Sequence, residues 1–397
     1  MYYLFIVKRI IENIFIFPFV LLGRFYASKR PLANEFDVFL FFPFYHIGGA
    51  DKVHYLIAQA VGSSNAVIFF TRKSDNDLYY EEFVKSGCEI HDISTFTDNK
   101  SKYYNNLIYR GIISAYINRQ KKKPVVFNGQ CNFAYKLSPW IRSGSRQLEL
   151  IHSYSSFSWI RVPFIQYYAK TIMISKVRIE DHLRQYERLA VPKRYAGNIE
   201  YIINGIALPQ QPPLKNPFAE QLEIIYVGRG TEEKRVHLIA RVAQVCAEKK
   251  LPVSFTFAGE VKNSIPAEYH QYARFLGNIS AAEILNGIYE RSHILVMAST
   301  TEGFPMVVME AMAYGLVIIS TDVGDLPVHV VDGKNGFLIS QKSSPEKIVS
   351  DTVKCIETLV QDRALIQKIQ LENIAYAHRH FGLTQFNRAY QELIYAK

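Results

Sequence analysis

The feature that most constrains this chain is a regular alternation of short apolar runs with longer stretches of helical periodicity. In the first half, the spacing of apolar residues predicts helices over 50–61, 102–119, 159–169 and 177–186. The apolar runs between them predict strands over 37–43, 66–70, 89–93, 124–128, 147–151, 171–175 and 199–203. Strands that alternate with helices at this spacing are typical of parallel sheets with crossover helices.

A proline-rich segment interrupts this alternation near the middle of the chain. Residues 204–218 contain Pro209, Pro212, Pro213 and Pro217, which exclude a regular helix or strand. The alternation then resumes, with strands expected over 223–227, 253–258, 294–297 and 317–320 and helices over 234–248, 281–289, 305–314 and 345–377. The sequence therefore predicts an α/β protein with two doubly wound, Rossmann-like domains facing a cleft, with ligands beyond the carboxyl ends of the strands.

Charge is distributed unevenly between the two halves. Residues 1–203 carry 27 basic and 16 acidic residues, a net charge of +11, whereas residues 204–397 carry 19 and 20. A basic first half is expected to face a nucleic acid, a membrane surface or an anionic substrate. Disulfide scaffolds and metal sites of the C-x-x-C type are excluded because the cysteines lie far apart, at Cys88, Cys131, Cys246 and Cys355.

Two segments of the first half are both apolar and basic. Residues 1–34 contain no uninterrupted apolar run of the roughly 18–20 residues that a membrane-spanning helix needs. They are expected to form a helix that either packs on the first domain or lies on a membrane. Residues 100–123 hold seven basic residues and no acidic one, with apolar residues at helical spacing. This second segment either packs on the first sheet or docks on an anionic bilayer.

A third segment, 299–315, carries two glutamates around the start of a predicted helix. Glu302 precedes the helix and Glu310 lies within it, while Pro305 suits the first helical position. Amides at such a helix start favour an anion, and each carboxylate can accept two sugar hydroxyls. The alternative is a pair of solvated surface glutamates. In segment 227–235, Gly228 would let a phosphate approach the backbone, with Arg229 and Lys234 as donors or as ordinary solvated cations.

These motifs together resemble retaining glycosyltransferase family 4, which has the GT-B fold. The Glu302-Gly303-Phe304-Pro305…Glu310 spacing is similar to that of the family, as is Gly228-Arg229…Lys234 placed upstream. Further similar segments follow in the family's order, at 47–53 (with Asp51 where Glu is usual), 202–206, 275–277 and 323–338. The resemblance implies transfer of a sugar from a nucleoside-diphosphate donor with retention of anomeric configuration.

The resemblance also implies roles for individual residues. Glu302, Arg229, Lys234 and His152 would be catalytic, with the two cations neutralising the diphosphate and His152 near the donor sugar, unless His152 is structural. Donor-binding residues would be Glu310 at the ribose and Gly48, Gly49, Gly303, Phe304, Pro305, Met306, Val307, Gly228, Phe275, Leu276 and Gly277. No metal and no cofactor is expected, because the family works without a metal and the chain has no convincing D-x-D motif.

The domain organisation that follows has an acceptor domain at 35–204 and a linker at 205–220. A nucleotide-sugar domain is expected at 221–380, and a helix that crosses back to the first domain at 381–397. Expected partners are a glycan or lipid-linked acceptor and an anionic membrane surface met by the N-terminal domain, with no nucleic acid. We expect a cytoplasmic protein, peripheral on the inner face of the cytoplasmic membrane, that builds lipopolysaccharide or another surface polysaccharide. The alternatives are an epimerase-like or phosphorylase-like GT-B enzyme, a basic nucleic-acid-binding protein and a catalytically silent scaffold.

Overall fold

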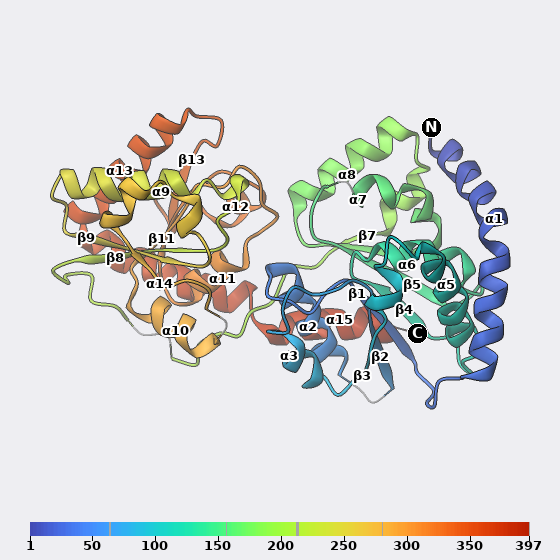
Figure 1. Cartoon of the computed structure of the whole chain (residues 1–397). Helices are drawn as coiled ribbons and strands as arrows, with labels where there is room; N and C mark the ends of the chain where they lie inside the picture. The colour runs from blue at the N-terminus through green and yellow to red at the C-terminus, as the bar shows by residue number, and fades with distance from the viewer. Residues whose placement is uncertain (63–64, 156, 212–213, 280, 397) are drawn as a thin grey trace. The chain divides into compact units, whose positions relative to one another are not determined.

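The computed structural model describes residues 1–62, 65–155, 157–211, 214–279 and 281–396. The chain divides into two compact units (Figure 1). Unit 1 comprises residues 1–203 together with 386–397, and unit 2 comprises residues 204–385. The predicted α/β class with two Rossmann-like parallel sheets is confirmed, since each unit contains one such sheet.

Unit 1 is built on a seven-stranded parallel sheet of order β3-β2-β1-β4-β5-β6-β7. All seven predicted strands are present, at β1 Val38–Phe42, β2 Ala66–Phe70, β3 Glu89–Asp92, β4 Val125–Asn128, β5 Arg146–Ile151, β6 Lys170–Met173 and β7 Ile199–Tyr201. Every residue of β1 and β2 is buried. Near-continuous apolar runs are expected of parallel strands that helices cover on both faces.

The helices of unit 1 match the predicted periodicity except at one place. The longer ones are α2 Gly49–Val61, α5 Tyr103–Asn118 and α8 Lys176–Leu189, and the short ones are α3 Tyr80–Val84, α4 Ser94–Thr97 and α6 Asn132–Leu137. The helix predicted over 159–169 is wrong. There α7 Phe157–Ile160 is followed by the 3-10 helix Val162–Tyr167. Pro163 explains the change, because it lacks an N–H and restricts the residue before it.

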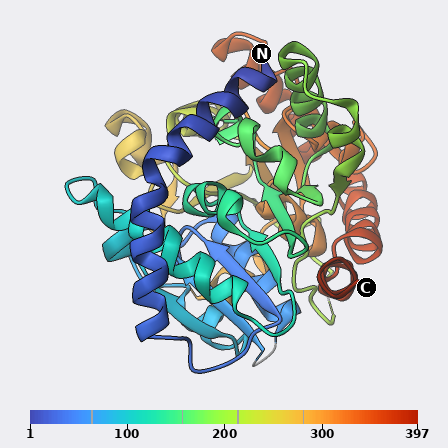
Figure 2. The same cartoon turned by 90° about the vertical axis from the view of Figure 1, so that its right-hand side faces the viewer.

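A long first helix, α1 Tyr2–Lys29, lies lengthwise on unit 1 over α5 (Figure 2). Two glycines allow the close contact. A Cβ on Gly23 would lie 2.0 Å from the carbonyl oxygen of Ile108, and one on Gly111 would lie 2.1 Å from that of Val20. The N-terminal segment is therefore a helix packed on the first domain, although its outer face stays uncovered. In the part of the chain that the structure describes, no helix has the length and apolar character needed to cross a membrane.

Unit 2 holds a six-stranded parallel sheet of order β10-β9-β8-β11-β12-β13. The four predicted strands are present, at β8 Leu222–Val227, β9 Val253–Ala258, β11 Ile294–Met297 and β12 Val317–Thr321. The sequence did not indicate the two edge strands β10 Arg274–Phe275 and β13 Gly336–Ile339. The helices are α9 Val236–Glu248, α10 Ala282–Arg291, α11 Met306–Ala313, α12 Leu326–His329, α13 Pro345–Gln361 and α14 Arg363–His380.

The single helix predicted over 345–377 is wrong, because the chain breaks it at Asp362. α13 ends at Gln361, and the Asp362 side chain accepts a hydrogen bond from the Leu365 amide to cap α14. Such a carboxylate satisfies an amide that would otherwise lack a partner at a helix start.

The last helix, α15 Leu383–Tyr395, belongs to unit 1 from residue 386 onward. The Gln391 side chain donates to the carbonyl of Ala60 at 2.8 Å, and the Tyr395 hydroxyl donates to the carbonyl of Val61 at 3.0 Å. Arg146, at the start of β5, donates to the carbonyls of Leu393 and Ala396. Unit 1 is therefore made of two stretches of chain that are separated in sequence by the whole of unit 2.

Candidate active site

The structure brings Glu302 and Lys234 together, although they are far apart in sequence. The Lys234 ammonium lies 2.5 Å from Glu302 Oε1, and the Ser299 hydroxyl donates to the same oxygen at 2.8 Å. The two charged side chains are only 17% and 10% exposed. Partial burial strengthens their electrostatic interaction, since less water screens it.

Arg235 joins the two segments that carry this ion pair, and sequence reasoning did not single it out. Its guanidinium donates to the carbonyls of Ala298 at 2.6 Å and Ser299 at 3.2 Å, directly after β11. The backbone of Arg235 is left-handed, with φ of 46°, where the 3-10 helix Glu232–Lys234 meets α9. The amide of Thr300 also donates to the carbonyl of Glu233 at 2.8 Å. These contacts fix the loop of Lys234 against the loop of Glu302.

A tight backbone contact holds the Glu302–Gly303 segment from its other side. Gly324 has a φ of 56°, and a Cβ at this position would lie 2.1 Å from the carbonyl oxygen of Gly303. The Asp325 amide donates to that same carbonyl at 2.8 Å. Any residue larger than glycine at position 324 would therefore displace the backbone beside Glu302.

Glu310 lies on α11 and has a buried partner. The Tyr289 hydroxyl, from α10, donates to Glu310 Oε2 at 3.0 Å. Burial, together with the Glu310 carboxylate, raises the pKa of Tyr289 well above its usual value. The hydroxyl therefore stays protonated and orients the carboxylate. Tyr289 was not recognised from sequence, because its role depends on a contact between two helices.

The segment that leads into α11 buries its aromatic side chain, Phe304. α11 begins at Met306, one residue later than predicted, and Pro305 precedes it. The Phe304 ring is buried and stacks on His329, with ring centroids 4.1 Å apart. A ligand near Gly303–Met306 would therefore meet amides and not the Phe304 ring.

The remaining predicted donor residues of unit 2 follow the carboxyl ends of neighbouring strands. Gly228 follows β8, and a Cβ on Gly259, after β9, would lie 1.9 Å from the Gly228 carbonyl oxygen. The Arg229 side chain is exposed, whereas its carbonyl accepts from the Tyr226 hydroxyl at 2.8 Å. Phe275, which begins the 275–277 turn, stacks on Phe257 with ring centroids 5.3 Å apart. Because the strands are parallel, these ends share one edge of the sheet with Glu302.

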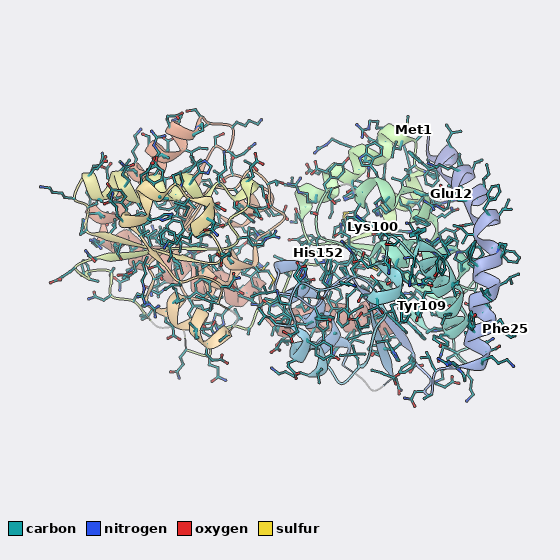
Figure 3. The ribbon with its side chains drawn as sticks, viewed as in Figure 1. Met1, Glu12, Phe25, Lys100, Tyr109 and His152 are labelled. Atoms are coloured by element: carbon teal, nitrogen blue, oxygen red, sulfur yellow. The ribbon has the colours of Figure 1, made fainter. Side chains whose placement is uncertain are left out.

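The predicted residues of unit 1 surround a group of histidines. His152 follows β5, and its Nε2 lies 2.9 Å from Nε2 of His54 on α2. Burial and the neighbouring His54 ring lower the pKa of His152 well below its usual value, so this imidazole is neutral at pH 7. Figure 3 shows His152 on the side of unit 1 remote from α1. His54 was not predicted, since no motif marks it.

Gly48 and Gly49 begin α2 beside these histidines. A Cβ on Gly48 would lie 2.6 Å from Oδ2 of Asp51, whereas a Cβ on Gly49 would have nothing within 4 Å. Asp51 is buried and lies 3.4 Å from the His46 ring nitrogen. The turn is therefore tight at Gly48 and open at Gly49, where a ligand could reach the backbone.

Comparisons with known proteins match the second unit by sequence. Residues 221–358 match the family model described as "Glycosyl transferases group 1". The D-inositol 3-phosphate glycosyltransferase of Corynebacterium aurimucosum is 29% identical over 151 residues, which cover 35% of this chain and 35% of that protein. The sulfoquinovosyl transferase of Arabidopsis thaliana is 30% identical over 154 residues, 38% of this chain and 29% of that protein. The aligned part of this chain thus spans about a third of the length of these relatives.

Comparisons with solved structures extend over nearly the whole chain. The Anabaena protein HepE, solved in complex with UDP and glucose, matches with a TM-score of 0.70 at 15% identity, over 91% of this chain and 100% of that one. The lipopolysaccharide outer core galactosyltransferase WaaB matches with a TM-score of 0.64 at 17% identity, over 90% and 98%. At such identities the likeness establishes the fold. The chain therefore has the two-domain GT-B fold of glycosyltransferases, and its second unit contains a glycosyl transferases group 1 domain.

Proposed function

We propose that this protein is a retaining glycosyltransferase that transfers a sugar from a nucleoside-diphosphate donor to a glycan acceptor. The observation that carries the proposal is the half-buried Lys234–Glu302 pair, held at the carboxyl edge of the unit 2 sheet. Glu310 and its partner Tyr289 lie on the same unit and supply a second oriented carboxylate. The presence of UDP and glucose in the HepE structure supports a nucleotide-sugar donor.

The charges of the site suit the reaction. Breaking the bond between a sugar and a diphosphate places negative charge on the leaving oxygen and positive charge on the anomeric carbon. In our proposal Lys234 and Arg229, with the amides that begin α11, stabilise the diphosphate as it leaves. Glu302 accepts hydrogen bonds from hydroxyls of the sugar, and Glu310 from those of the ribose. These cations would neutralise the diphosphate, which is the role that a metal ion would otherwise have. We therefore propose transfer without a metal or other cofactor.

Unit 1 contributes uncharged groups in this proposal. The neutral His152 imidazole, held by His54, would hydrogen-bond a hydroxyl of the donor sugar. The open turn at Gly49 would let a phosphate approach the backbone at the start of α2. Neither role needs a charged side chain, in keeping with the lowered pKa of His152.

We further propose that the acceptor is lipid-linked and that the product is a surface polysaccharide such as lipopolysaccharide. The enzyme would then work as a peripheral protein at the inner face of the cytoplasmic membrane. The net charge of +11 over residues 1–203 supports an anionic surface as partner of unit 1. The name of one structurally similar protein, a lipopolysaccharide outer core galactosyltransferase, fits an acceptor of this class.

A donor screen followed by product analysis tests the function. Nucleotide sugars of each common base should be added to the purified chain, and a true donor should raise its melting temperature. Incubation of that donor with lipid-linked acceptors should then give a glycoside whose anomeric configuration, measured by NMR, is that of the donor. Lys234→Met should abolish most transfer. An inverted product would contradict retention, and an epimerised free nucleotide sugar would favour the epimerase-like alternative.

A further inference from the structure

The outer face of α1 is the largest collection of exposed apolar side chains on the described part of the molecule. Of 27 exposed large hydrophobic residues, 14 lie between Met1 and Tyr26. Phe15, Leu4 and Ile14 are the most exposed, at 76%, 72% and 66%. A contiguous apolar surface of this extent marks an interaction site in a folded protein. Met1, Glu12 and Phe25 are labelled in order along this N-terminal segment in Figure 3.

The opposite face of α1 is packed against the rest of unit 1, so the helix cannot turn its apolar outer face inward without breaking those contacts. Val20, Gly23 and Ala27 are buried against unit 1, with the glycine contacts described above. At the N-terminal end, Tyr2 is buried in a cluster with Tyr186 and Leu189 of α8. By contrast, the apolar stripe of α5 is covered, since Ile113 and Ile117 are buried in the sheet core. Of the two apolar-basic segments, α1 therefore presents the larger apolar surface, since only Tyr103 and Tyr104 are exposed large hydrophobic residues in the other.

Beside the N-terminal half of α1 lies a pocket of about 250 Å³ that is rich in cations. Lys8 and Arg9 line it from α1, Asn132 and Lys136 from α6, and Trp159 from α7. Within the described residues, the donor Arg9 Nε is buried and has no hydrogen-bond partner. Glu12 pairs with Arg9, and the Lys136 ammonium donates one hydrogen bond to the Tyr103 hydroxyl at 3.1 Å, which leaves its other two N–H groups and the Lys8 ammonium for a ligand. Buried polar atoms without partners are costly unless a ligand satisfies them.

We propose that the outer face of α1 rests on an anionic lipid bilayer and that this pocket receives a headgroup phosphate. The phosphate would accept hydrogen bonds from Arg9 Nε and from the ammonium groups of Lys8 and Lys136. Trp159 is 41% exposed at the pocket, and such amphipathic rings favour the level of the headgroups. This inference rests on the proposed membrane partner but not on sugar transfer.

Charge favours a bilayer over a second copy of the chain as the occupant of this face. Lys8, Arg9 and Lys136 lie toward one end of the face, and Arg24, Lys29 and Arg30 toward the other. Two copies packed through α1 would bring two sets of these cations together, which is unfavourable. An anionic surface would instead attract both ends while the apolar centre enters the interface.

Flotation with vesicles tests the proposal, using the full chain without any donor. Vesicles of phosphatidylcholine alone are compared with vesicles that also contain phosphatidylglycerol. The wild type should bind the mixed vesicles at least tenfold more tightly, and Lys8→Glu or Lys136→Glu should remove most of this preference. Lys73→Glu, an exposed lysine after β2 with the same charge change, should have little effect. Phe15→Ser combined with Ile14→Ser should weaken binding to both kinds of vesicle.

Three outcomes would overturn the proposal. If Lys73→Glu lowers binding as much as Lys8→Glu, the attraction is one of net charge and there is no phosphate site. Equal binding of the wild type to both kinds of vesicle, or no binding to either kind, would also overturn the proposal. A concentration-dependent dimer in light scattering that Phe15→Ser dissociates would make a second copy the occupant. The melting temperature with a donor nucleotide is measured in parallel, so a failure of the transferase proposal is recognised separately.

Discussion

The clusters around Glu302 in unit 2 and His152 in unit 1 differ in the kind of side chains that they bring together. Both follow the carboxyl end of a strand of a parallel sheet. The first joins two opposite charges, Lys234 and Glu302, in a half-buried ion pair. The second joins two imidazoles, His152 and His54, at 2.9 Å, with the His152 pKa lowered by burial. Unit 2 therefore offers an ion pair where unit 1 offers the neutral imidazole of His152.

The difference shows which kinds of site can be recognised from sequence. Charged residues next to glycines after a strand stand out as a motif, because they would be costly there without a purpose. A histidine on a buried helix face, such as His54 on α2, looks in the sequence like any core residue. The predictions below test whether charge in unit 2 and neutrality in unit 1 are the properties that matter.

The largest effect is expected from Lys234→Met. Losing a charge-assisted contact to the diphosphate should cost about 1.5–3 kcal/mol, or roughly tenfold to a hundredfold in transfer rate. The control is Lys249→Met, which removes an ion pair with Glu357 in the same unit from a lysine that is 50% exposed. The turnover of both variants should be measured with the donor found by screening. Equal losses in the two variants would contradict a special role for the Lys234 charge.

The next effect concerns the neutral histidines of unit 1. Burial, with a contribution from Arg161, lowers the pKa of His182 to about 3. The folded state therefore keeps His182 neutral, whereas the unfolded state protonates it below its pKa of about 6.5. The free energy of unfolding should therefore fall as the pH falls below about 6.5. Between pH 7.5 and 5.0 the wild type should lose about 2 kcal/mol more stability than His182→Gln.

Tryptophan fluorescence during urea unfolding measures this loss of stability in unit 1. Both tryptophans, Trp140 and Trp159, belong to unit 1. His378→Gln, at an exposed position near the end of α14, is the control and should keep the pH dependence of the wild type. If His182→Gln also keeps it, acid sensitivity does not arise from this ring.

A smaller effect is expected from Glu310→Gln. The amide keeps the shape of the carboxylate but can accept fewer ribose hydroxyl protons, which should weaken nucleotide binding by about tenfold, or ~1.4 kcal/mol. Calorimetric titration with the free nucleoside diphosphate measures this affinity without the sugar. Unchanged affinity would remove Glu310 from the donor site.

The smallest effect is expected from Tyr289→Phe. Removing the hydroxyl that orients Glu310 should cost about 0.5–1 kcal/mol of nucleotide affinity. The control is Tyr314→Phe, whose ring stacks on Tyr289 with centroids 5.7 Å apart. The same titration should show no change for the control. A larger loss in Tyr289→Phe than in Glu310→Gln would mean that the tyrosine itself meets the nucleotide.

Much of the fold could be predicted because parallel strands are buried on both faces and therefore appear as apolar runs. β10 was missed because its two residues form no run, and β13 because it begins with Gly336 inside a turn-rich motif. Of the candidate site, Lys234, Glu302 and Glu310 were named from the sequence. Tyr289, Arg235 and His54 were not, because their roles depend on contacts with partners 21, 63 and 98 residues away.

The division of unit 1 into two stretches of chain determines when that unit can be completed during synthesis. Residues 386–396 leave the ribosome only after all of unit 2 has been made. Until then the carbonyls of Ala60 and Val61 lack their partners from α15, and the space beside Phe127 lacks the Tyr390 ring. Unit 2 can therefore finish folding first, which reverses the usual order in which the earlier domain folds first. A released chain truncated after residue 385 should protect unit 2 from proteolysis while unit 1 stays susceptible.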